Sequence, residues 1–250
     1  MEKRILEVCV DSLESALAAK QGGADRLELC SGLVVGGLTP SPALFDAVRE
    51  ETGLPVNVLI RPRFGDFLYT SGELEIMARD MAYFAQRGAS GLVTGALRPD
   101  GRLDRGAMGE LLAAAGGRPV TLHRAFDVCR DPRETMELAF ALGVGTILTS
   151  GQQADAWTGR DLIGELLDRA EGRGDILIGG GVNAAVIRDF RRSLPLARCF
   201  HMSGKEVLDS GMTFRNPRVS MGLPGISEFQ VWRTGEDAVR EAAKALKKDI

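Results

Sequence analysis

The alternation of apolar and polar positions repeats one pattern eight times along the chain. Each repeat has a short run of β-branched or aliphatic residues, a loop, a segment with helical spacing of apolar residues, and then glycine. The short runs predict eight strands. The predicted strands are Ile5–Val10, Arg26–Cys30, Val56–Arg61, Gly91–Ala96, Val120–Ala125, Thr146–Ser150, Ile176–Gly180 and Arg198–Ser203.

Start signals for the helices stand between these strands. Three pairs of residues have the spacing of a capping box, in which the first side chain accepts a hydrogen bond from a free amide and a glutamate reaches back. Ser41 precedes Pro42, as is typical of a cap residue followed by proline at the first helical position. The capping-box pairs are Asp11 with Glu14, Thr70 with Glu73, and Asp131 with Glu134.

Short strands that alternate with helices predict parallel pairing through crossover connections. Eight units without a break in composition favour a closed (β/α)8 barrel, a TIM barrel, formed as a single domain by residues 1–250. An open doubly wound sheet remains the alternative, because strand order cannot be read from a sequence.

Two connections are longer than the others. Residues 61–70 follow the third predicted strand and residues 204–234 follow the eighth, before a closing helix over 235–248. Long loops in a compact domain are usually lids, binding loops or interface segments. Within the second connection, residues 212–221 and 225–230 could cover the barrel or build a subunit interface, and we expect a homo-oligomer.

Charge and composition exclude several classes of partner. The chain has 31 basic and 34 acidic residues without a basic stripe, so we expect neither nucleic acid nor a membrane surface as a partner. No stretch approaches the roughly 18 apolar residues of a membrane span, and the N-terminal apolar run is too short for a signal peptide. The four cysteines are therefore interpreted as reduced thiols of a cytoplasmic protein. They are Cys9, Cys30, Cys129 and Cys199.

The candidate chemistry gathers at the carboxyl ends of the predicted strands, where barrels of this kind place their sites. Side chains alternate between the two faces of a strand, so parity sorts them. Both histidines of the chain lie near such an end. The residues assigned to shared faces are Glu7 with Cys9, Glu28 with Cys30, Asn57 with Arg61 and Arg63, His123 with Thr121, and His201 with Cys199 and Ser203.

Each of these residues also has a purely structural interpretation. A glutamate inside a strand can bond an arginine between strand and helix, and a histidine can be a satisfied core residue. Glu7 and Glu28 at matching places on adjacent strands favour a shared polar pocket. Arg61 and Arg63 are either solvated loop charges or an anion clamp beneath an aromatic lid. The aromatic residues of that lid are Phe64, Phe67 and Tyr69.

Glycines after the seventh and eighth strands indicate an anion site. Phosphate sites of such barrels are frequently built there from exposed backbone amides. We predict an anion site at Gly180, Gly181, Ser203 and Gly204, to which Ser150 after strand six could add a hydroxyl. The alternative is that the glycines only form a tight turn.

Cys9 and Cys30 occupy equivalent positions on neighbouring strands, so their sulfur atoms could approach each other. Thiolates select Cu(I) or Zn(II). Buried cysteines are commonly small hydrophobic residues, and there is no Cys-x-x-Cys motif. A hard-metal site of Glu7, Glu28, His123 and His201 is conceivable but ranks below a pocket for acid–base chemistry.

The order of several motifs resembles the copper homeostasis protein CutC family nearly from end to end. The resemblance implies a TIM barrel, a cytoplasmic oligomer and a link to copper, with Cys9 and Cys30 as thiol ligands; it indicates no organic cofactor. The motifs are residues 5–10 (ILEVCV), 22–30 (GGADRLELC), 36–41 (GGLTPS), 60–63 (IRPR), 123–127 (HRAFD), 148–151 (LTSG), 179–182 (GGGV) and 201–204 (HMSG).

Two hypotheses follow. The first is a copper-binding protein with Cu(I) on the two thiolates. The second is an enzyme, a lyase, isomerase or hydrolase acting on a small phosphorylated or carboxylated metabolite, in which Asp127 or Glu28 orients His123 as general acid and base. A ligand-sensing barrel without turnover is a third possibility. The pocket of the second hypothesis comprises Glu7, Glu28, Asn57, Arg61, His123, Arg124, Asp127, Ser150, His201 and Ser203.

Overall fold

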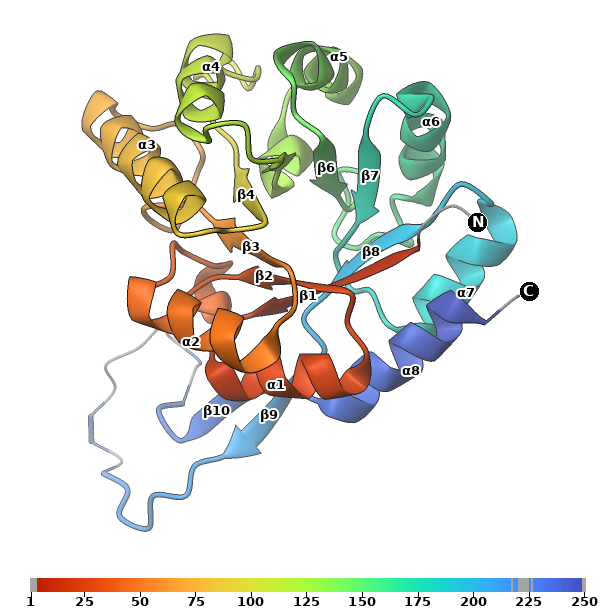
Figure 1. Ribbon diagram of the computed structural model, residues 1–250. Coiled ribbons are helices and arrows are strands. Elements are labelled where there is room, and N and C mark those ends of the chain that lie inside the picture. Colours follow the sequence, from red (N-terminus) through yellow and green to blue (C-terminus); the bar gives the residue numbers. More distant parts are fainter. Residues whose placement is uncertain (1–3, 217, 220–224, 226, 249–250) are drawn as a thin grey trace.

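The computed structural model describes residues 4–216, 218–219, 225 and 227–248. Eight parallel strands form a closed barrel in sequence order, and β8 pairs with β1 (Figure 1). This closure confirms the predicted (β/α)8 barrel and excludes the open sheet. The strands are β1 Ile5–Val10, β2 Arg26–Leu29, β3 Val56–Leu59, β4 Gly91–Thr94, β5 Val120–Leu122, β6 Thr146–Thr149, β7 Asp175–Ile178 and β8 Cys199–Met202.

Helices surround the barrel on its outer face (Figure 1). Two short 3-10 helices, η1 Leu33–Val35 and η2 Arg124–Val128, follow β2 and β5 at the carboxyl ends of these strands. The α-helices are α1 Leu13–Gly22, α2 Pro42–Thr52, α3 Ser71–Gln86, α4 Arg105–Ala114, α5 Pro132–Leu142, α6 Arg160–Ala170, α7 Ala184–Ser193 and α8 Glu236–Lys247.

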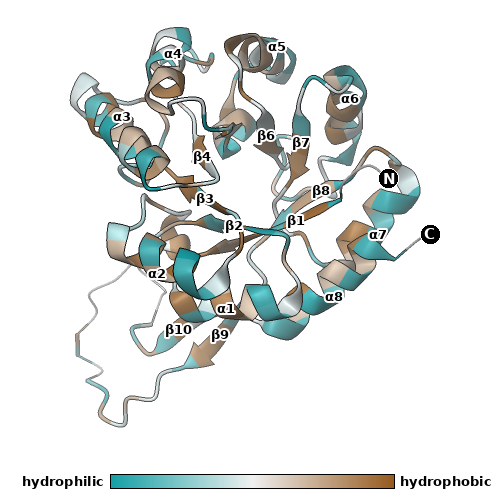
Figure 2. Ribbon diagram, in the orientation of Figure 1, coloured by the Kyte–Doolittle hydropathy of each residue, from teal (hydrophilic) through white to brown (hydrophobic). Residues whose placement is uncertain are grey.

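The main hydrophobic core lies between the strands and the helices. Apolar colour in Figure 2 follows the strands and the inner faces of the helices, while polar colour covers the outer faces. In β1, Leu6 and Val8 belong to this core, whereas Glu7 and Cys9 alternate to the inside of the barrel. The strand parity predicted from the sequence therefore places the polar residues inside.

The cap residues agree with the sequence signals at three helices, including Ser41 at α2, and differ at a fourth. Thr70 and Glu73 form the full capping box of α3, and Asp131 caps α5. At α1 the prediction is wrong by one residue, because Ser12 is the N-cap and accepts from the amide of Ser15. Asp11 accepts instead from the Leu33 amide at 3.1 Å, so its side chain fixes the start of η1.

The connection after β8, which the sequence predicts to be a long loop, contains two strands. They are β9 Lys205–Asp209 and β10 Gln230–Thr234, which pair antiparallel as a hairpin next to α1 (Figure 1). Thr234 ties the hairpin to the barrel, since its amide donates to Ser15 and its hydroxyl donates to the Ser203 carbonyl. Residues 217, 220–224 and 226 of this connection, which include part of the expected cover or interface, lie outside the described residues.

Most strands end before the predicted boundary, and this shift moves several candidate residues. Arg61, His123 and Gly180 begin the loops at the carboxyl ends of β3, β5 and β7, whereas His201 remains inside β8. Loop residues at this end of a barrel face the site directly. Within the described ranges, no helix is both long enough and apolar enough to cross a membrane.

Candidate functional site

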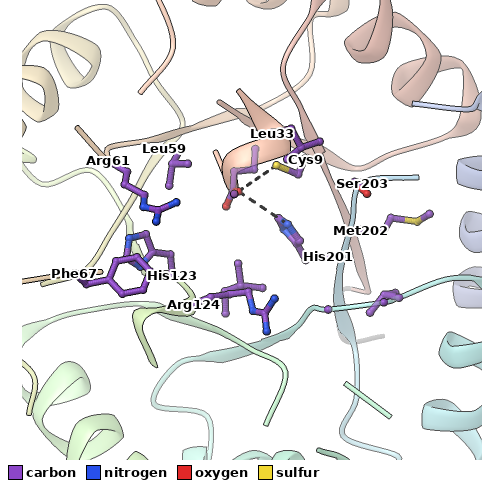
Figure 3. A pocket seen from close by; sticks show the side chains of 16 residues that line it. Cys9, Leu33, Leu59, Arg61, Phe67, His123, Arg124, His201, Met202 and Ser203 are labelled. Carbon is purple, nitrogen blue, oxygen red and sulfur yellow. Dashed lines mark hydrogen bonds and ion pairs between the residues drawn. The ribbon is translucent and has the colours of Figure 1, made fainter. Parts of the chain in front are cut away.

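A cavity of about 260 Å³ opens at the carboxyl ends of the strands (Figure 3). Its walls come from β1, β2 and β8 and from the loops after β3, β5 and β7, so residues from both ends of the chain meet there. The polar residues and cysteine that line it are Cys9, Glu28, Arg61, His123, Arg124, His201 and Ser203, together with the backbone of Gly180 and Gly181.

Beneath the cavity, Glu7 is the centre of a buried hydrogen-bond network. The strand register places Glu7 opposite Arg26 on one side and opposite His201 on the other. Arg26 Nε and Asn57 Nδ2 donate to Glu7 Oε2, and His201 Nδ1 lies 2.8 Å from Glu7 Oε1. Every oxygen of this fully buried carboxylate therefore has a partner, as a buried charge requires.

These contacts separate the protonation behaviour of the two glutamates. Burial opposes the charged form of Glu7, but the hydrogen bond with His201 and the charge of Arg26 outweigh it and lower its pKa. Burial raises the pKa of Glu28, which has fewer compensating contacts, above its ordinary value. Burial also opposes the imidazolium of His201, yet Glu28, Cys9 and Glu7 together hold its pKa well above the usual value. An ionised Glu7 thus faces a cationic His201, beside a second carboxyl that keeps its proton more readily.

Cys9 and Cys30 lie where the sequence placed them. Their Sγ atoms are 3.8 Å apart, and Cys9 Sγ donates to Glu28 Oε1 at 3.4 Å. The hydrogen bond with Cys30 and burial raise the pKa of Cys9 well above its ordinary value, so the free side chain is a thiol. Only Cys9 lines the cavity; Cys30 lies behind it and contacts the Val10 carbonyl.

Three side chains bring metal-binding atoms together at the floor of the cavity. Ligand atoms of Cys9, Glu28 and His201 all lie within 4.8 Å of one another. A sulfur, an imidazole nitrogen and a carboxylate oxygen form a mixed donor set that suits Cu or Zn better than Mg or Ca. This set differs from the hard-metal site that the sequence left conceivable, because it lacks Glu7 and His123 and includes the Cys9 sulfur.

One wall of the cavity is formed by Arg61, Phe67 and His123 (Figure 3). The guanidinium of Arg61 lies 5.0 Å above the Phe67 ring, and that ring packs on His123 with 4.7 Å between ring centres. Arg61 donates to the carbonyl groups of Gly37 and Gly65. In the described part of the chain, no carboxylate lies within ion-pair distance of Arg61, so its charge is balanced by carbonyl dipoles and by the face of the Phe67 ring.

His123 is held as a neutral hydrogen-bond donor. Its Nδ1 accepts from the amide of Ala125, so the proton of the neutral ring is on Nε2, which is buried and has no partner. Burial and the nearby Arg61 charge lower the pKa of His123 to about 3. The prediction that Asp127 or Glu28 orients this histidine is wrong, since neither carboxylate hydrogen-bonds it within the described structure.

The opposite wall comes from the turn after β7. Gly180 and Gly181 have φ values of +99° and +69°, and a Cβ on Gly180 would lie 2.9 Å from Ser150 Cβ. Glycine is therefore required there for both backbone conformation and space. Arg124 lies across this turn and is fixed by Asp127 Oδ2 at 2.7 Å and by Ser150 Oγ at 2.8 Å.

Several predicted pocket residues do not line the cavity. Glu7 and Asn57 lie in the layer below it, and Asp127 and Ser150 support Arg124 from behind. The carboxylate of Asp127 accepts from Thr149, Ser150 and Gln152, so it anchors the β6 loop.

Two further predictions of cavity residues are wrong. Arg63 turns to the surface and pairs with Glu73 and Asp66, so Arg61 alone supplies the charge of the expected clamp. Gly204 faces the β9 side, where Gly235 donates to its carbonyl, because the chain turns away into the hairpin.

Arg26 belongs to the buried hydrogen-bond network beneath the cavity, and the sequence analysis did not identify it. It is the first residue of β2, and its side chain is only 17% exposed where it pairs with Glu7. An unpaired buried glutamate is costly, so the sequence does hold a signal: Arg26 lies two residues before Glu28, on the same strand face. Pairing of that arginine with Glu7 becomes evident only from the strand register.

The closed parallel barrel defines a TIM-barrel protein, and its polar cavity lies at the carboxyl ends of the strands, where such barrels place their sites. The model of the CutC family matches residues 4–205, and the chain belongs to that family. The match ends where the β9–β10 hairpin begins.

Relatives resemble the chain over nearly its whole length. A human protein named copper homeostasis protein cutC homolog is 43% identical and covers 98% of this chain and 90% of its own. A family protein CutC from Bacteroides thetaiotaomicron is 45% identical over 99% of this chain and all of its own. The crystal structure of a CutC protein from Streptococcus agalactiae superposes with a TM-score of 0.76 at 31% identity and covers 80% of this chain and 98% of its own.

Proposed function

We propose that this CutC protein takes part in copper homeostasis by binding Cu(I) at the floor of the cavity. The observation that carries the proposal is the convergence of Cys9, Glu28 and His201 within 4.8 Å, with the Cys30 sulfur 3.8 Å from that of Cys9. Soft sulfur ligands select Cu(I), and imidazole also suits copper. The human relative is named copper homeostasis protein cutC homolog, which supports copper as the metal in this proposal.

The separation of the two sulfur atoms favours a shared ion. Taking the Zn–S distance of about 2.3 Å as a guide, two thiolates on one ion lie about 3.8 Å apart at a tetrahedral angle and about 4.6 Å apart when linear. The first value matches the observed spacing of Cys9 and Cys30. In this proposal His201 completes the ligand set, and Glu28 accepts the hydrogen bond of the Cys9 thiol before the metal displaces its proton.

Titration of the reduced protein with Cu(I) against a competing colorimetric chelator tests the proposal. We expect about one ion per chain. Cys9→Ser should lower the Cu(I) affinity by about tenfold or more, because it removes one of the proposed thiolate ligands. Cys129→Ser is the matched control, since Cys129 is buried against Gln152 on the η2 side of the barrel. An unchanged affinity in Cys9→Ser would contradict the proposal.

The pH dependence provides a second measurement on the same site. Burial and Cys30 raise the pKa of the Cys9 thiol, so Cu(I) must displace a proton from it over the whole neutral range. Affinity should therefore rise by about tenfold per pH unit for each ligand that loses a proton, and the His201 imidazolium is such a ligand as well as the Cys9 thiol. A Cu(I) affinity that is independent of pH between 6 and 8 would mean that Cys9 is not a ligand.

Location and assembly complete this proposal. A Cu(I)–thiolate site needs cysteines that stay reduced, and the four cysteines are free thiols, which supports a cytoplasmic protein. We also propose that the chain assembles into homo-oligomers through the region of the β9–β10 hairpin.

Acid–base catalysis is a second candidate function, because Glu28 lines the cavity with a buried Oε2 that has no hydrogen-bond partner in the described structure. Its pKa is raised, whereas the pKa of the neighbouring Glu7 is lowered. Such a separation commonly assigns acid and base roles. Glu28 would exchange the proton, and Glu7 would hold His201 in place. A thermal-shift screen of metabolites on the metal-free protein identifies a candidate ligand. We expect Glu28→Gln to be stabilised by that ligand as the wild type is. A product assay should then show turnover by the wild type and none by Glu28→Gln. Turnover of the same ligand by Glu28→Gln would exclude this role.

A further inference from the structure

The unpartnered polar groups of the cavity are mostly hydrogen-bond donors. His123 presents a buried Nε2–H without an acceptor, and Arg61 carries a guanidinium without a carboxylate partner. A buried donor without a partner costs free energy, so such groups indicate a missing acceptor. Two donors of this kind share one wall.

Further donors lie on the opposite wall. None of the amides of Gly180, Gly181 and Val182 donates to a protein acceptor in the described structure, and neither does the hydroxyl of Ser203. Successive amides of residues with positive φ form a concave surface that suits anions. The guanidinium of Arg124 adjoins this turn, with its central carbon 3.8 Å from the Cβ position of Gly180.

This group of donors does not depend on the end of helix α7. The side chain of Asn183 already accepts from the amides of Ala185 and Val186, so those helix amides are occupied. The free amides belong to the turn before the helix, and the nearby Arg124 is rigidly held by Asp127 and Ser150.

The size of the cavity limits its ligand. Its volume of about 260 Å³ lies just below the range of roughly 300–1,000 Å³ that is common for small-molecule pockets. A ligand that reaches both walls is therefore short. Its middle would lie over the thiol of Cys9 and the carboxyl of Glu28 on the cavity floor.

We propose that the cavity binds a small organic anion with a phosphate at one end and a carboxylate at the other. The phosphate lies on the Gly180–Val182 amides with Arg124 and Ser203, and the carboxylate lies against Arg61 and His123. This inference goes beyond copper binding and names the substrate class for the second candidate function, but the binding itself does not require turnover.

Calorimetric titration of the metal-free full-length protein with inorganic phosphate, glycolate and phosphoglycolate tests the proposal. Phosphoglycolate carries both charged groups on a two-carbon frame, so we expect it to bind at least about tenfold more tightly than phosphate or glycolate. Absence of binding by phosphoglycolate at millimolar concentration would overturn the proposal.

Substitutions on each wall test which residues bind the phosphate and which bind the carboxylate. Arg124→Gln should weaken phosphate and phosphoglycolate by about tenfold. Arg61→Lys should remove most of the advantage of phosphoglycolate, because lysine has no counterpart of the buried, unpartnered Nε–H of Arg61. Ser203→Ala is a milder second variant of the phosphate wall. Arg133→Gln is the matched control, because Arg133 forms a similar ion pair with Glu165 on the outer helices. Equal phosphoglycolate affinity in wild type and a folded Arg124→Gln would refute the assignment.

The same variants separate this site from the copper site. Arg124→Gln should retain Cu(I) affinity. Cys30→Ser, at a residue behind the cavity, should weaken Cu(I) but retain phosphoglycolate affinity, because each substitution leaves the other set of contacts intact. A failure of the Cu(I) titration therefore leaves the anion result interpretable.

Discussion

His123 combines full burial with an unused hydrogen-bond donor, and this makes its protonation a stability effect. Its pKa is lowered to about 3 in the folded protein, against an ordinary value of 6.5. The unfolded chain therefore binds the proton first as the pH falls. The stability contribution of the neutral ring is fully present above pH 6.5 and is lost progressively toward pH 3.

Replacement of His123 by asparagine should flatten this dependence. Asparagine keeps an acceptor near the Ala125 amide but does not titrate. Between pH 6.5 and 4.5 the wild type should lose about 2 kcal/mol more unfolding free energy than His123→Asn, since one proton corresponds to at most about 1.4 kcal/mol per pH unit. Urea unfolding at a series of pH values measures the difference. Parallel plots of unfolding free energy against pH for the two proteins would show that folding does not lower the pKa of His123.

At the residue scale, parity along strands was sufficient to place Glu7, Cys9, Glu28 and His201 inside the barrel. Which of them touch was not predictable, because contacts depend on the stagger between strands. Glu7 meets His201 only because β8 pairs with β1 in one particular register. The opposite roles of the two histidines likewise follow from their neighbours, two carboxylates in one case and an arginine in the other.

At the element scale, the turn between β7 and α7 depends on Gly180. Alanine there would adopt an unfavourable positive φ and would place its Cβ 2.9 Å from Ser150 Cβ. Gly172 is a matched control, because its φ is also positive but no atom lies within 4 Å of its Cβ position. Gly172→Ala should cost about 1 kcal/mol of unfolding free energy from backbone strain, and Gly180→Ala about 1–3 kcal/mol more from overpacking. Equal losses in denaturant unfolding would contradict the crowded turn.

Cap signals predicted the elements well where the cap side chain has no competing partner. Thr70 forms its capping box as expected. Asp11 does not cap α1, because its carboxylate is used by the Leu33 amide of a loop that is distant in sequence. The β9–β10 hairpin was also missed. β9 is exposed along its whole length and β10 is mostly half-buried, and neither strand shows an alternation of apolar and polar residues.

At the scale of the whole molecule, the hairpin region carries exposed apolar side chains. Leu208, Met212 and Phe214 are 45%, 59% and 76% exposed, which is unusual for neighbouring large apolar residues. We expect this surface to contact a second copy of the chain. Light scattering after size exclusion should give a multiple of 26.8 kDa, and Phe214→Asp with Leu208→Asp should lower the mass to the monomer. Val128→Asp, an exposed apolar position on η2, should leave the mass unchanged; a monomeric wild type would disprove the expectation.

The architecture as a whole was predictable because each of the eight repeats has the same sequence pattern of a strand, a loop and a helix. Closure was favoured by their number, but the sequence contains no direct record of the β1–β8 pairing. That pairing rests on contacts between Ile5–Val10 and Cys199–Met202, at nearly opposite ends of the described chain.

The Glu7–His201 contact spans 194 residues, and this has a consequence for the protein as it is made. At about 5–20 residues per second, a ribosome needs roughly 10–40 seconds after β1 emerges to synthesise β8. During that interval the nascent barrel has an open strand edge, and Glu7 lacks its histidine partner. The cavity is therefore complete only after β8 is available to pair with β1, and ligand loading must follow that step.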